Sequence, residues 1–206
     1  MSFRNLAIVM TAALALAGCN KNPLQVTRQI CPAVAVPAYT GDVTLFTRAG
    51  DMNADAIDMV AAVTNVRGTC VDDGANLTTS VHFDVLARRN DSSAARDVTL
   101  PWFTAVVQGG DHLAAKQMGQ VTVHFNAGQD RAQASATAQT VVARSATSLP
   151  PAIEQRLTRK RKPGDEDAAI DPMSDPKIRS AVHDASFEVL VGFQLNQAQL
   201  AYNATK

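Results

Sequence analysis

Four histidines are the side chains best suited to acid–base or metal chemistry in this chain. His82 and His124 stand in the same local string, Val-His-Phe, and each is predicted on the polar face of a strand. If these two strands were neighbours in a sheet, the two imidazoles could share a metal ion, as in a metal-dependent hydrolase. Zinc sites take three or four ligands, so we favour two exposed histidines and predict no metal site. His112 is expected at a turn, and His183 and Asp184 on opposite sides of a strand, where they form no relay.

Motifs for nucleophilic or phosphate chemistry do not occur in the sequence. There is no Gly-x-Ser-x-Gly elbow, no His-Glu-x-x-His helix, no Gly-x-Gly-x-x-Gly loop and no P-loop. The pair Gly109-Gly110 is a turn signal rather than a phosphate cradle. We therefore expect a protein that is not an enzyme, with no catalytic residues and no cofactor.

The first residues carry a more specific signal. A short start with one basic side chain leads into an apolar run at residues 6–16, which is too short to span a bilayer as a helix. The run ends in Leu-Ala-Gly-Cys at residues 16–19, which resembles the lipobox of bacterial lipoproteins. The resemblance implies cleavage before Cys19, attachment of diacylglycerol to its thiol, and a mature chain held at the membrane by lipid. The alternative is an ordinary secreted protein with a chance cysteine near its cleavage site.

We accordingly expect residues 1–18 to be a signal peptide and residues 19–39 to be a lipidated N-terminus and spacer. Within the spacer, Val34 and Val36 are predicted along a sheet edge. In enteric relatives, an Asp at the position directly after the lipid-bearing Cys retains lipoproteins at the inner membrane. This chain has Asn20 at that position. The resemblance therefore implies the outer membrane, facing the periplasm, with the inner membrane as the alternative.

If Cys19 carries lipid, Cys31 and Cys70 remain as a pair. Because the periplasm is oxidising, we predict a structural disulfide between them. It would close a loop of roughly 40 residues, worth about 4 kcal/mol in the chain-entropy model. The alternatives are a metal site, which lacks a nearby histidine, and a redox pair, whose Cys-x-x-Cys spacing is absent.

Composition limits the partners. The 19 basic and 19 acidic residues balance, and aromatic residues make up 5% of the chain. Nucleic-acid binding is disfavoured because it depends on a basic surface. The length from Cys19 onward is enough for one domain with its own core.

Alternation of apolar and polar residues indicates strands through most of the mature chain. The clearest is residues 79–89, where Val81, Phe83 and Val85 share one face. Other strands are predicted at 43–48, 57–64, 98–108, 120–126, 131–143 and 186–194. A capping box at Asn196 and Gln199 predicts a short C-terminal helix. About seven strands predict a mainly β fold, namely an antiparallel sandwich of two sheets. One candidate for its strand order is the immunoglobulin order. We expect residues 40–206 to form a single domain of this kind.

Residues 149–182 break this pattern because they are rich in proline and charge and lack a sustained apolar face. We predict a solvated excursion or a partly disordered loop, with two helical turns at 153–162. Its basic residues would suit anionic lipid headgroups, but we favour a charge run balanced by the carboxylates at 165–167. These basic residues are Arg156, Arg159, Lys160, Arg161 and Lys162.

Three strings resemble an uncharacterised group of proteobacterial envelope lipoproteins: residues 31–32, 100–103 and 192–203. The resemblance spans most of the mature chain and implies no activity. Pro101 cannot donate to a ladder, which predicts an edge or a bulge there. Trp102 and Phe103 beside it are either an exposed anchor for a partner, making Pro101–Phe103 a partner surface, or part of the core.

These observations favour a non-enzymatic, lipid-anchored envelope protein whose β-domain binds or scaffolds another component. The first alternative is a periplasmic carrier of a small apolar ligand or lipid, and the second is a metal-dependent hydrolase with an unseen site. The expected partners are the membrane, through the lipid, and an envelope protein or lipid, but no nucleic acid.

Overall fold

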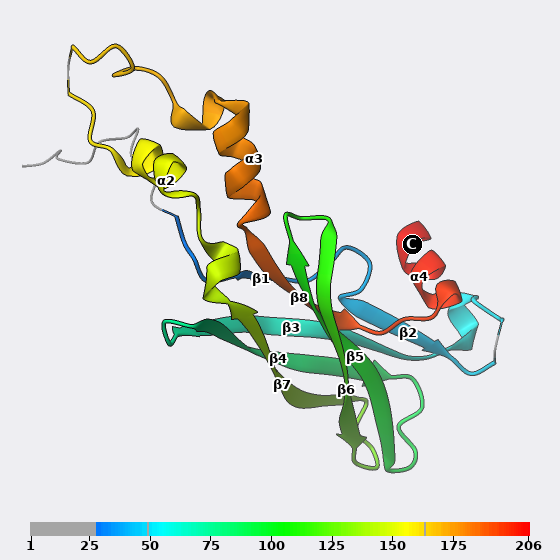
Figure 1. The fold of residues 1–206 in the computed structure, drawn as a ribbon. Helices are drawn as coiled ribbons and strands as arrows, with labels where there is room; N and C mark the ends of the chain where they lie inside the picture. The colour runs from blue at the N-terminus through cyan, green and yellow to red at the C-terminus, as the bar shows by residue number, and fades with distance from the viewer. Residues whose placement is uncertain (1–27, 49, 163) are drawn as a thin grey trace, which may run out of the picture. The chain divides into compact units, whose positions relative to one another are not determined.

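The computed structural model describes residues 28–48, 50–162 and 164–206 (Figure 1). Within them, eight strands form two four-stranded sheets that pack face to face, with strand orders β1-β8-β5-β6 and β2-β3-β4-β7. The first sheet contains β1 (Ala33–Ala35), β8 (Phe187–Phe193), β5 (Arg96–Gln108) and β6 (His112–Phe125). The second contains β2 (Asp42–Phe46), β3 (Ile57–Asp72), β4 (Asn76–Arg89) and β7 (Arg131–Ala143). The predicted mainly β sandwich is confirmed, whereas the lipobox residues 16–19 lie outside the described residues.

The connections are mostly antiparallel hairpins, and only β1, among the described strands, pairs in parallel, with β8. The consecutive strands β2, β3 and β4 lie side by side in one sheet. In the constant-type immunoglobulin order, neither sheet holds three consecutive strands as neighbours. The strand order of this sandwich is therefore not that of a constant-type immunoglobulin domain.

The core lies between the two inner faces. Val81, Phe83 and Val85 are fully buried there, as the alternation predicts. Phe83 meets the indole of Trp102 edge to face, with 5.4 Å between ring centroids. Gly119, opposite Trp102 on β6, makes room for that indole, because a Cβ at Gly119 would lie 2.1 Å from it.

A disulfide joins the two sheets near the start of the domain. Cys31 precedes β1 and Cys70 lies on β3, with 6.0 Å between their Cα atoms, so the predicted bond is confirmed. Gly68 on β3 allows β1 to approach, since a Cβ there would lie 2.4 Å from Val34. Val34 thus lies in the edge strand β1, as predicted, whereas Val36 follows its end.

The C-terminal helix α4 (Gln197–Thr205) begins at the predicted capping box of Asn196 and Gln199. It docks on the sandwich at β2. The amide of Asn203 donates to the carbonyls of Tyr39 and Asp42 at 2.8 and 2.7 Å. Short 3-10 turns occur at η1 (Ala54–Ala56) and η2 (Arg144–Thr147).

Residues 150–179 belong to a separate compact unit. It holds α2 (Pro151–Thr158), η3 (Pro172–Ser174) and the first part of α3 (Pro176–Asp184), so the segment contains helices rather than one long loop. Leu157 and Ile178 are buried.

Three arginines of this unit form ion pairs with its acidic residues. Arg156 lies 2.9 Å from Asp175, and Arg159 and Arg161 both contact Asp167. For Arg159 and Arg161 the structure agrees with the predicted balance by the carboxylates at 165–167, whereas Arg156 pairs with Asp175 outside that run.

Candidate binding groove on the outer face of the β2-β3-β4-β7 sheet

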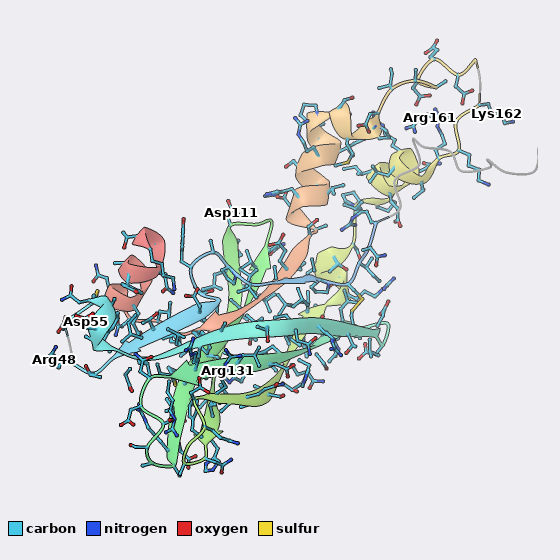
Figure 2. The ribbon with its side chains drawn as sticks, turned by 180° about the vertical axis from the view of Figure 1, so that it is seen from behind. Arg48, Asp55, Asp111, Arg131, Arg161 and Lys162 are labelled. Carbon is cyan, nitrogen blue, oxygen red and sulfur yellow. A yellow bond between two sulfur atoms is a disulfide. The ribbon has the colours of Figure 1, made fainter. Side chains whose placement is uncertain are left out.

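The register of the second sheet aligns two rows of side chains on its outer face. One row runs from Thr44 on β2 through Val60 and Arg88 to Arg131 on β7. The next row runs from Asp42 through Ala62 and Leu86 to Gln133. Together these residues line a groove of about 600 Å³, which we call the sheet groove. Arg131, at the start of β7, is labelled in Figure 2.

The floor of the sheet groove is apolar and open to solvent. Val60 is 40% exposed and Leu86 46% exposed, on adjacent strands, with Ala62 between them. The solvent face of an antiparallel sheet is normally polar. Isolated exposed apolar residues are common, but these three are contiguous and line a hollow, which makes them a candidate contact surface.

The two ends of the sheet groove differ in charge. At the β2 end, Lys206 pairs with Asp42, so the charges there cancel. At the β7 end, Arg88 and Arg131 are directly opposite each other on β4 and β7. Asp130 approaches Arg88 at 3.5 Å, and Arg131 has no ion pair within the described part of the chain. The β7 end therefore carries excess positive charge.

A buried arginine holds this end of the sheet in place. Arg89 is 3% exposed, and its guanidinium donates to four carbonyl oxygens at 2.7–3.4 Å. The acceptors are the carbonyls of Ser92, Ala94, Asn126 and Gln129. The guanidinium carbon of Arg89 lies 4.9 Å from the centroid of the Phe125 ring, and the backbone N–H of Arg89 donates to the Asp130 carbonyl. Arg89 thereby fixes the turns that precede β5 and β7, and with them the positions of Arg88 and Arg131.

Sequence reasoning identified neither the sheet groove nor Arg89. The signal for Arg89 was present, because it continues the inward spacing of Val81, Phe83, Val85 and Ala87. A charged residue at such a position must find internal partners. The groove had no comparable signal, because it depends on which residues of four strands stand opposite one another.

The alternative in which His82 and His124 share a metal ion requires their strands to be neighbours, and they are not. His82 lies on β4 and His124 on β6, which belong to different sheets. Among the described residues, no group of three or more His, Cys, Asp or Glu side chains is arranged to hold a metal. The shared-metal hypothesis for these two residues is therefore wrong.

Each histidine has its own neighbours. The Nδ1 of His124 lies 2.5 Å from Asp97, and this hydrogen bond, with a second to Asn126, raises the pKa of His124. His82 lies 3.2 Å from the Thr137 hydroxyl and 3.6 Å from Asp84. The latter distance is too long for a hydrogen bond, so the carboxylate does not orient that imidazole.

His183 and Asp184 lie at the end of helix α3, not on a strand, and their side chains approach to 3.3 Å. The prediction that they face opposite ways is therefore wrong. His112 begins β6 just after the turn at residues 109–111, close to its predicted position.

The predicted partner surface at Pro101–Phe103 divides between core and surface. Trp102 is 8% exposed and packs in the core, so it does not serve as an exposed anchor for a partner. Pro101 is exposed, and Phe103 is half-buried beneath Lys116, whose Nζ lies 4.9 Å from the ring centroid. β5 lies between β6 and β8, but β8 pairs with it only from Trp102 onward, so Pro101 stands at a local edge.

Comparison of the chain with protein-family models, with curated proteins and with solved structures finds no match. The interpretation of the sheet groove therefore depends on the chemistry of its lining residues. Among the helices of the described residues, none has the length and apolar character needed to cross a bilayer.

Proposed function

We propose that this chain is a non-enzymatic lipoprotein of the bacterial cell envelope. Cys19 carries the lipid, the outer membrane is the anchoring membrane, and the β-sandwich is a binding domain that uses the sheet groove. The observation that carries the proposal is the Cys31–Cys70 disulfide, because such bonds persist in oxidising compartments. The lipobox string at residues 16–19 supports the same compartment.

The binding role is supported by the sheet groove. It is a contiguous apolar hollow with charged ends, and two further exposed valines, Val71 and Val141, lie elsewhere on the same sheet face. Its volume of about 600 Å³ falls within the roughly 300–1,000 Å³ of small-molecule sites. The alternative function, a carrier of a small apolar ligand, would also use the sheet groove and not the interior of the sandwich. The pocket between β2 and β5, beside α4, measures only about 90 Å³.

The anchor is tested by growing cells with radiolabelled palmitate. Wild-type chain is expected to incorporate label, and Cys19→Ser is expected to abolish it. A matched variant with both Cys31 and Cys70 replaced by Ser keeps the label per molecule, because only Cys19 accepts lipid. Label that persists in Cys19→Ser, or a wild-type chain without label, overturns the lipoprotein proposal.

A further inference from the structure

We propose that the sheet groove binds a single-chain carboxylate amphiphile of the fatty-acid type. Its carboxylate lies between Arg88 and Arg131, and its chain lies over Val60, Ala62 and Leu86. The inference deepens the proposed function, since it rests on the domain being a binding module. It does not require Cys19 to be lipidated.

The charge at the β7 end favours an anion. Like charges directly opposite each other on neighbouring strands are destabilising, and Arg88 and Arg131 are such a pair. Asp130 provides one carboxylate, which lies 3.5 Å from Arg88. The three groups together leave one net positive charge. A carboxylate matches this charge, whereas a phosphate monoester carries about 1.5 to 2 negative charges at neutral pH.

The geometry of guanidinium groups also suits a carboxylate. Arginine presents a planar fork of donors that matches the two oxygens of a carboxylate. Both arginines extend from the outer face of the sheet, in the same cross-strand row as Val60. An anion bound there would offset the repulsion between them.

The apolar floor sets the form of the rest of the ligand. The sheet groove crosses from β2 to β7, which is three strand spacings or about 14 Å. Its middle is formed by Val60, Ala62 and Leu86, which offer no charge to a polar ligand. The Lys206–Asp42 pair closes the far end with cancelled charges. The ligand is therefore charged at one end only, with its apolar chain pointing toward β2.

The test uses the full chain in phosphatidylcholine nanodiscs and two photoreactive probes of equal length. One is a diazirine-bearing dodecanoate, and the other is the corresponding dodecyl trimethylammonium compound. After irradiation, mass spectrometry maps the labelled residues. We expect dodecanoate label on the β3 and β4 segments around Val60 and Leu86, suppressed by unlabelled dodecanoate. Equal labelling there by the cationic probe contradicts the proposal, because it would show partition without charge recognition.

Variants test the two arginines. Arg88→Gln with Arg131→Gln is expected to reduce dodecanoate labelling about tenfold, as for loss of one charge-assisted interaction of ~1.4 kcal/mol. Lys116→Gln, which removes one charge from the other sheet, is the matched control and keeps labelling within about twofold of wild type, since exposed distant charges are screened. Circular dichroism confirms that each variant is folded. Undiminished labelling in the folded double variant overturns the proposal, while palmitate incorporation at Cys19 reports separately on the anchor.

Discussion

Buried and paired side chains stand out at the scale of single residues. Arg89 is the clearest case, because it is a charged group in a core position whose guanidinium donates to four backbone carbonyls. A buried charge is tolerated only where such partners compensate for lost hydration. It therefore organises the loops that position the arginines of the sheet groove.

Replacement of this arginine should be costly. Arg89→Met is expected to lower the free energy of unfolding by about 2–4 kcal/mol, because four carbonyls lose a charged donor. Urea denaturation with the disulfide intact measures the loss. Arg88→Met, one residue earlier and exposed, is the control and should change stability by no more than about 0.5 kcal/mol. Equal effects of the two substitutions would contradict the role assigned to Arg89.

His124 provides a test of local electrostatics. Its pKa is raised above the usual 6.5, chiefly by the hydrogen bond that the protonated imidazole donates to the Asp97 carboxylate. The resulting stability is present below pH 6.5 and is lost as pH rises through the raised pKa. NMR titration of the His124 imidazole should give a pKa above 6.5, and Asp97→Asn should lower it. An unchanged His124 pKa in Asp97→Asn would contradict the assignment.

At the scale of elements, strands were predictable where one face is covered. Residues 79–89 alternate cleanly because their inner face lies in the core, and their place in β4 is confirmed. The first half of β6, from His112 to Met118, was missed. Its residues are exposed on both faces, so burial imposes no alternation there and only hairpin pairing with β5 extends the strand. The sheet groove was unpredictable for a related reason, since it requires the register of four strands.

The β5–β6 pair contains a close approach that can be tested. Gly119→Ala would place a Cβ 2.1 Å from the Trp102 ring and force the indole to move. We expect a loss of about 1–3 kcal/mol in unfolding free energy, as for overpacking of a core. The chain has one tryptophan, so its fluorescence reports the displacement directly. Gln120→Ala, on the next residue and exposed, should leave both the emission spectrum and stability unchanged.

At the scale of the whole molecule, the cysteine arithmetic was sufficient to predict which thiols pair, because a third was assigned to lipid. It did not predict that the bond would join two sheets. That result follows from β1 pairing with β8 while Cys70 lies on β3. The division at residues 150–179 was signalled by proline and charge, but its helices were only partly visible in the sequence.

Loss of the disulfide should destabilise the sandwich strongly. Cys70→Ser is expected to cost about 4 kcal/mol through the greater entropy of the unfolded chain. Denaturant unfolding measures the change, and alkylation with mass spectrometry confirms the free Cys31 thiol. The double variant Cys31→Ser with Cys70→Ser should lose the same amount, because both remove one cross-link. A much larger loss in the double variant would indicate that the thiols contribute in another way.

The placement of Cys31 also has a mechanical consequence. Strand β1 pairs with β8 over only three residues, so few backbone hydrogen bonds hold it in the sheet. Because Cys31 precedes β1 and is bonded to β3, any pull on the chain ahead of it passes through a covalent bond into a 16-residue strand. A force applied from the N-terminal side is thus carried by the disulfide and β3, and not by the β1–β8 pairing alone.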